Sequence, residues 1–270
     1  MFLIASNLTT RDTKVEQAMR YAKVAEWEVN SQPAESLKEL TERCATAGAN
    51  AIEINTQQHY DLPEAMAFAV NVVQQQCDLQ LCLSSNNAET LEAGLRACKR
   101  PPLVNYVSVD EARLKEALPA AARHNAGVIF LVSDPSSPTD AREMLQKAAI
   151  LVGAANAAGI SNDRILVDPG LIHVTSALGQ RHLVEVVEFM RNLPDATDPE
   201  VRSTCWLANS STGAPRRRRS IIETSLLPML AGAGLSSVFL DVLRSENRRA
   251  ARLVKIFKNE LVYSDGDIEL

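Results

Sequence analysis

The chain has 270 residues, 46% of them hydrophobic, and a formal net charge of -5. This length and apolar content suit one large α/β core, and the acidic balance argues against a general affinity for nucleic acid or for a membrane surface. The amino-terminal segment MFLIASNLTTRD lacks the basic start and long apolar stretch of a signal peptide. We therefore expect a cytoplasmic protein with a single domain over residues 1–270.

Short apolar runs alternate with helix-patterned segments along the whole chain. The runs predict strands at residues 2–6, 50–55, 79–84, 102–108, 127–134, 164–169, 204–209 and 237–242. Helices are predicted at residues 15–29, 34–47, from an N-cap at Asp61 onward, and at 87–98, 110–123, 139–158, 177–193, 220–233 and 244–259. Such alternation predicts a parallel sheet covered by helices.

A closed (β/α)8 TIM barrel is favoured over an open, doubly wound sheet. The open sheet needs a glycine-rich turn after its first strand, and the segment ASNLTTRD contains no glycine. Nearly every predicted strand also ends in a polar residue, and the carboxyl ends of barrel strands open onto one mouth. These residues are Asn7, Asn55, Asn86, Asn105, Asp168, Asn209 and Asp241.

Carboxamides and hydroxyls outnumber acids and histidines at these strand ends. Such groups donate and accept hydrogen bonds but are poor acids, bases or nucleophiles at neutral pH. The five cysteines are an odd number, and no histidine stands beside Cys82 or Cys98, so structural thiols are favoured over a zinc site. The sequence therefore predicts a site for a flat, neutral heterocycle and no bound metal.

Five motifs follow one another in a characteristic order: CLSSN, EAGLRACK, VNYVS, ILVDPG, and WLANSS followed by a basic loop. In order and spacing they resemble the methyltetrahydrofolate:corrinoid protein methyltransferases. That family shares its barrel with dihydropteroate synthase and with the folate domain of cobalamin-dependent methionine synthase. The resemblance covers about residues 49–263 and implies a pterin-binding barrel that forms a homodimer.

The resemblance also implies roles for individual residues. In the family, the residues matching Asn105 and Asp168 hydrogen-bond the amide and amino edge of the pterin, and the residue matching Asn209 reaches its N5 atom. Asn209 is therefore the implied catalytic residue. The implied substrate-binding residues are Ser84, Asn105, Asp168, Asn209, Asn7, Asn55 and Arg217. Independently, a carboxylate such as Asp168 suits the paired N–H groups of a 2-amino-pyrimidinone.

The implied reaction transfers the N5-methyl group between methyltetrahydrofolate, the substrate, and the cobalt of a corrinoid carried by a partner protein. Three departures from the family pattern keep alternatives open. Ser84 stands where the family commonly has an aspartate, and the first strand lacks the family's arginine and glutamate. The second strand often ends in D-x-N in the family, and here Glu53 replaces that aspartate two residues before Asn55. The alternatives are another pterin-binding enzyme, such as a dihydropteroate synthase, and a silent barrel that acts as a scaffold.

The basic run Arg216–Arg219 also has two interpretations. Runs of like charge are commonly a solvated face or a helix start. Guanidinium groups beside the mouth also suit the glutamate tail of a folate or an acidic face of a partner.

Overall fold

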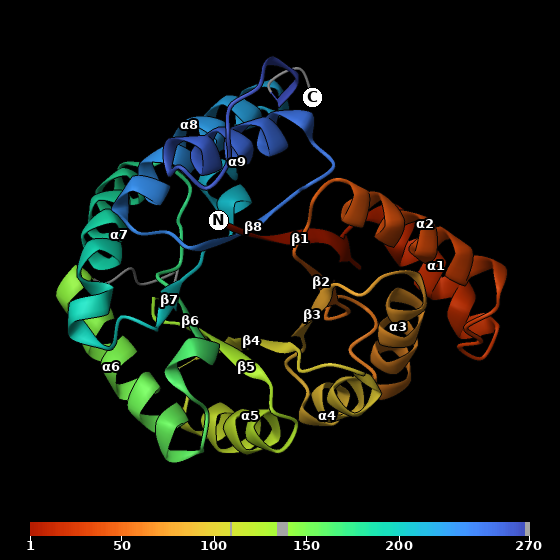
Figure 1. Cartoon of the computed structure of the whole chain (residues 1–270). Helices are drawn as coiled ribbons and strands as arrows, with labels where there is room; N and C mark the ends of the chain where they lie inside the picture. The colour runs from red at the N-terminus through yellow and green to blue at the C-terminus, as the bar shows by residue number, and fades with distance from the viewer. Residues whose placement is uncertain (109, 134–139, 268–270) are drawn as a thin grey trace.

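Eight parallel strands form one curved sheet within residues 1–108, 110–133 and 140–267, which the computed structural model describes. The predicted strand end at Asp134 and helix start at Thr139 lie outside these residues. In Figure 1 the sheet curls into a ring with the helices outside it, which confirms the predicted TIM barrel. The strands are β1 (Phe2–Thr9), β2 (Ala51–Asn55), β3 (Gln80–Ser84), β4 (Leu103–Val107), β5 (Gly127–Leu131), β6 (Ile165–Asp168), β7 (Arg202–Ser203) and β8 (Ser237–Leu240), in the order β7-β6-β5-β4-β3-β2-β1-β8.

The barrel closes at a short seam between β8 and the segment that follows β7. Trp206 forms a parallel bridge with Phe239, and the backbone N–H of Phe239 donates to the carbonyl oxygen of Cys205 at 2.9 Å. The rings of Trp206 and Phe239 stack with their centroids 5.0 Å apart. Aromatic packing therefore supports the closure where the hydrogen-bonded ladder is shortest.

The predicted strand over residues 204–209 was wrong. The strand β7 ends at Ser203, and a 3-10 turn, η2 (Leu207–Ser211), takes up the second half of the predicted strand. The hydroxyl of Ser210 donates to the carbonyl oxygen of Leu207 at 2.7 Å within this turn. Such local side-chain bonds compete with a strand ladder for the backbone, which explains the difference.

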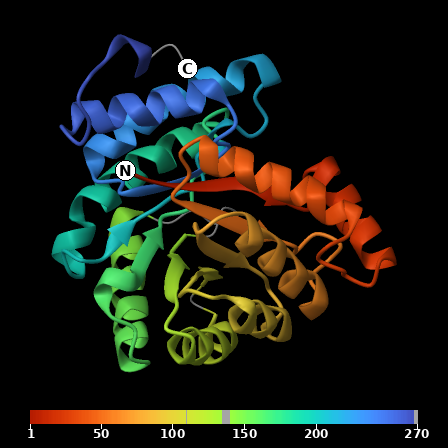
Figure 2. The same cartoon turned by 45° about the vertical axis from the view of Figure 1, so that its right-hand side comes forward.

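Helices cover the outside of the barrel. They are α1 (Thr13–Val24), α2 (Gln32–Thr46), α3 (Pro63–Gln76), α4 (Ala88–Ala97), α5 (Glu111–Arg123), α6 (Ala141–Ala157), α7 (Ala177–Ala196), α8 (Arg216–Ala233) and α9 (Ser245–Phe257). The pair α1 and α2 connects β1 to β2 and projects to the right in Figures 1 and 2. Among the helices of the described residues, none is both long and apolar enough to cross a membrane.

Several helix boundaries differ from the sequence prediction, and α1 ends at Val24 rather than at Val29. Helix α8 begins at Arg216 rather than at Ser220, so the four arginines form its first turn. At α3 the N-cap is Leu62, not Asp61. The carboxylate of Asp61 instead accepts a hydrogen bond from the hydroxyl of Ser85 at 2.5 Å, and so holds the loop after β3.

Side chains inside the barrel form an apolar layer with a polar layer above it. The apolar layer consists of Ile4, Ala51, Cys82, Leu103, Ile129, Leu166 and Phe239. Because side chains alternate across a strand, residues two positions further on face the same interior, nearer the carboxyl ends. On β2, β3, β4 and β6 these residues are Glu53, Ser84, Asn105 and Asp168. The apolar layer is thus the floor of a polar interior.

Candidate functional site

One part of the polar layer is a group of four hydrogen-bonded residues, Glu53, Asn55, Ser84 and Asn105, which we call the Glu53 cluster. The hydroxyl of Ser84 donates to Oε1 of Glu53 at 2.6 Å, and Nδ2 of Asn55 donates to the same oxygen at 3.1 Å. Nδ2 of Asn105 donates to the Ser84 hydroxyl at 2.9 Å. The parallel register of β2, β3 and β4 sets Asn55 beside Ser84 and Ser84 beside Asn105, which brings the cluster together.

The second part of the polar layer is the carboxylate of Asp168. One of its oxygens accepts from the backbone N–H of Gly170 at 2.7 Å, and the other accepts from the hydroxyl of Tyr106 at 2.8 Å. The Tyr106 ring also lies 6.5 Å from the ring of Phe239 in the floor. Tyr106 therefore fills interior space between β4 and β6 and links the two parts of the layer.

Burial shifts the acidity of both interior carboxyl groups. Burial raises the pKa of Glu53 to about 7, against the opposing effect of its bonds to Ser84 and Asn55. Burial likewise raises the pKa of Asp168 to about 6, opposed by the bonds from Gly170 and Tyr106. Both groups can change protonation state near neutral pH when a ligand alters their surroundings.

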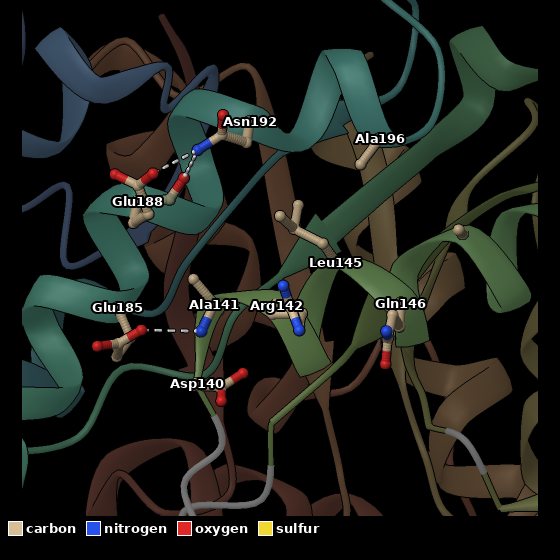
Figure 3. A pocket seen from close by; sticks show the side chains of 10 residues that line it. Asp140, Ala141, Arg142, Leu145, Gln146, Glu185, Glu188, Asn192 and Ala196 are labelled. Atoms are coloured by element: carbon tan, nitrogen blue, oxygen red, sulfur yellow. Dashed lines mark hydrogen bonds between the residues drawn. The ribbon is translucent and has the colours of Figure 1, made fainter.

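The grooves on the surface of the described residues include a larger and a smaller one outside this interior. The larger, about 1130 Å³, is lined by α1 and α2 and reaches Asn7 and Asp241 beside the ends of β1 and β8. The smaller, about 790 Å³, lies between α6 and α7, where Glu185 accepts from the backbone N–H of Ala141 at 2.9 Å (Figure 3). Helices rather than strand ends line the smaller groove, so it is separate from the barrel mouth.

A family model described as "Pterin binding enzyme" matches residues 27–238. The chain belongs to the pterin-binding enzyme family. The polar interior above an apolar floor therefore lies in the barrel of a pterin-binding enzyme, as the order of the sequence motifs indicated.

The chain is also similar to individual proteins. The protein is 24% identical over 204 residues to a methylcorrinoid:tetrahydrofolate methyltransferase of Eubacterium limosum, which covers 73% of this chain and 72% of the relative. It is 27% identical over 175 residues to the methionine synthase of Mycobacterium tuberculosis, which covers 60% of this chain but only 14% of that enzyme. A dihydropteroate synthase structure from Yersinia pestis superposes with a TM-score of 0.69 at 17% identity, over 96% of this chain and 94% of the other. That likeness shows a shared fold.

The structure brings together only some of the residues that the sequence assigned to the site of this pterin-binding enzyme. Ser84, Asn105 and Asn55 lie in the Glu53 cluster, and Asp168 is connected to them through Tyr106 next to Asn105. The other predicted residues are placed elsewhere around the mouth: Asn7 donates to Asp241 at 2.5 Å, Asn209 is exposed on η2, and Arg217 is exposed in the first turn of α8.

Two interior residues were absent from the predicted site. Glu53 had a detectable signal, because it is the acid in an apolar strand and alternates in phase with Asn55. No sequence pattern pointed to Tyr106, since simple strand alternation predicts that Asn105 faces the barrel interior and that Tyr106 faces outward. The register between β4 and β5 shifts between Val104 and Val107, and this irregularity accompanies the inward turn of Tyr106.

The pKa of Glu53 predicts how stability depends on pH. The folded-state pKa of about 7 lies above the ordinary glutamate value of 4.5, so the neutral carboxyl is favoured in the fold. The stabilisation from this group is complete below pH 4.5 and is lost as the pH rises through about 7. Between pH 6 and pH 8 the free energy of unfolding should fall by about 1 kcal/mol through this group.

Urea unfolding of the wild type and of Glu53→Gln at the two pH values measures this effect. We expect Glu53→Gln to lack this fall and to be the more stable protein at pH 8. The matched control is Glu42→Gln, an exposed position on α2. An equal fall in the Glu53→Gln variant would contradict the assignment.

Proposed function

We propose that this protein binds the pterin ring of methyltetrahydrofolate inside the barrel mouth and transfers the N5-methyl group between the folate and the cobalt of a corrinoid protein. The observation that carries the proposal is the polar interior, in which Glu53, Asn105 and Asp168 present acceptor atoms above the apolar floor of the barrel. The relative named methylcorrinoid:tetrahydrofolate methyltransferase, matched over 73% of the chain, supports the reaction. We propose further that the protein acts as a homodimer, as the motif resemblance implies, and that it works in the cytoplasm.

In this proposal the barrel binds and orients the ring. The Asp168 carboxylate accepts the paired N–H groups of the amino-pyrimidinone edge, and the Asn105 carboxamide serves a neighbouring ring nitrogen. Tyr106 must then release the oxygen of Asp168 that it occupies. Holding the ring in one orientation, with N5 facing the mouth, is the contribution of the protein to the rate.

The leaving nitrogen needs support as its bond to the methyl group breaks. A tertiary amine leaves poorly unless N5 becomes protonated or hydrogen-bonded, and the Asn209 carboxamide is a neutral donor suited to that position. Asn209 is exposed on η2, where a ligand in the mouth can approach it. The corrinoid, carried by a separate protein, supplies the cobalt that accepts or donates the methyl group.

A two-stage experiment tests the function. Calorimetry measures binding of methyltetrahydrofolate, and the cobalt absorbance of added reduced corrinoid proteins then reports methyl transfer. We expect micromolar or tighter folate binding followed by a methyl-cobalt signal. Absence of folate binding would overturn the whole proposal, and binding without transfer to any of several corrinoid proteins would overturn the reaction.

The silent-scaffold alternative has one observation in its favour. Glu53, Ser84, Asn105 and Asp168 are each at most 1% exposed, and Tyr106 already donates to Asp168. A barrel filled by its own tyrosine has less room for a pterin. The replacement Tyr106→Ser distinguishes the cases, because it should create folate binding in a silent barrel that has none and only modify the affinity of an enzyme.

The arginine run makes a separate prediction about approach to the mouth. Arg216–Arg219 are exposed at the amino end of α8, where the helix dipole disfavours cations. Binding of an anionic group would reduce the repulsion between the four arginines and the dipole. Replacing all four by glutamine should slow association with the corrinoid protein about three- to tenfold at low salt. Single-turnover transfer at saturation should be spared.

Stopped-flow association at several salt concentrations measures this effect. The control variant is Lys99→Gln with Arg100→Gln, which removes two exposed cations just before the amino end of β4. Equal slowing in the control, or slowing that does not depend on salt, would contradict a steering role for the run.

A further inference from the structure

The buried carboxyl of Glu53 is only partly satisfied by the protein. Its Oε1 atom accepts from Ser84 and Asn55, whereas its Oε2 atom is buried and has no hydrogen-bond partner among the described residues. The Oδ1 atom of Asn105 is in the same state, although its Nδ2 atom donates to Ser84. Two acceptors on β2 and β4, joined through one hydroxyl on β3, therefore lack donors.

Such a pair of acceptors is informative because buried polar atoms in proteins nearly always have partners. An acceptor left without a donor loses its hydration and gains nothing in return. When Glu53 is ionised the missing partners are N–H or O–H donors, since a carboxylate oxygen and an amide oxygen only accept hydrogen bonds. A ligand that brings two donors on one edge would satisfy both atoms.

We propose that Glu53 is a ligand-recognition residue, which accepts hydrogen bonds from N–H groups of the bound heterocycle while Ser84 holds its carboxylate in position. This inference rests on the proposed function, in which the heterocycle is a reduced pterin. In the sheet order, β2 lies four strands from β6, on the opposite wall of an eight-stranded barrel. Glu53 therefore faces the edge of the ring that Asp168 does not.

The chemistry of a reduced pterin fits two carboxylates on opposite walls. Its amino-pyrimidinone edge carries the N3–H group and one N–H of the 2-amino group, and the N8 side of the ring carries N8–H and the other N–H of that amino group. With Asp168 on the first edge, Glu53 and the Oδ1 atom of Asn105 are left for the second. The Glu53 carboxylate, held by the Ser84 hydroxyl, thus supplies from β2 the charged acceptor that an aspartate at position 84 would supply from β3.

Charges around Glu53 give this role a measurable signature. Its neighbours that carry or can carry charge are Arg11, which favours the carboxylate, and Cys82 and Tyr106, whose pKa values are raised, mainly by burial. The pKa of Glu53 is itself raised by burial to about 7, so part of the population is protonated at neutral pH. Ligand N–H donors favour the ionised form, and binding should therefore release protons.

Calorimetry with methyltetrahydrofolate tests the role of Glu53 through affinity. We expect Glu53→Gln to bind about tenfold more weakly than the wild type, because an amide is a poorer acceptor than a carboxylate. Adding Ser84→Asp to Glu53→Gln should restore affinity to within about threefold, since Ser84 Oγ lies only 2.6 Å from Glu53 Oε1. Ser84→Asp alone sets two carboxylates side by side and should bind no better than the wild type.

Proton release provides a readout that a purely structural role would not change. Titrations at pH 7 in two buffers of different ionisation heat should show release of a fraction of a proton by the wild type and by Glu42→Gln, and much less by Glu53→Gln. Folate binding with the same affinity and proton release in Glu53→Gln would overturn the inference and leave the proposed function intact. No folate binding by the wild type would overturn both. Thermal unfolding of each variant verifies that it is folded.

Discussion

Asp168→Asn is expected to weaken binding of methyltetrahydrofolate about tenfold to a hundredfold. Each oxygen of the Asp168 carboxylate already faces a donor, the N–H of Gly170 on one side and the hydroxyl of Tyr106 on the other. Asparagine has one acceptor oxygen, so its NH₂ group must face a donor on one side. Losing a hydrogen bond to a charged group costs about 1.5–3 kcal/mol, which corresponds to the expected loss of affinity.

The pH dependence of binding provides an internal check on this prediction. The pKa of Asp168 is raised to about 6 by burial, so the wild type should lose affinity as the pH falls below about 6 and the carboxyl becomes neutral. The Asp168→Asn variant should lack the part of this loss that begins below about pH 6 and should keep the part that comes from Glu53, whose pKa is about 7. Calorimetry between pH 5 and pH 8 measures both, and Asp163→Asn, exposed before β6, is the control. Unchanged affinity would remove Asp168 from the site.

Asn209→Ala should lower the rate of methyl transfer about a hundredfold to a thousandfold while changing folate affinity by less than about threefold. A donor that strengthens its bond to N5 as the methyl group leaves stabilises the transition state more than the bound substrate. Loss of one such preorganised donor commonly has this effect on kcat. The expected separation of rate from affinity follows from that difference.

Single-turnover transfer with saturating corrinoid protein gives the rate, and calorimetry gives the affinity. Asn71→Ala, an exposed carboxamide on α3 outside the barrel, controls for a general effect of losing an amide. Equal losses of rate and affinity would reduce Asn209 to a binding residue. A variant as fast as the wild type would exclude it from the chemistry.

The order of elements was readable from the sequence because it depends on local patterns. Apolar runs followed by helix-patterned segments predicted the barrel, and polar residues at the ends of the predicted strands predicted the position of its mouth. The alternation of side chains along β2 was sufficient to predict that Asn55 faces the barrel interior, on the same side as Glu53. The order of the motifs was sufficient to predict the family. These features could be predicted without knowing which residues that are distant in the sequence are in contact.

The pairing of interior side chains was decided only by the tertiary structure. Glu53 joins Ser84, 31 positions away, because the register between β2 and β3 sets their strands side by side. Tyr106 turns inward to Asp168 where the pairing of β4 with β5 becomes irregular, against simple strand alternation.

The closure of the barrel was also decided by the tertiary structure and not by the local sequence. The apolar segment 204–209 has the composition of a strand, yet within the part of the chain that the structure describes it makes a single bridge, from Trp206 to Phe239, before it turns. Whether an apolar segment pairs along its length depends on the geometry of the strands on both sides of the gap. That geometry is a property of the closed barrel and of no single stretch of sequence.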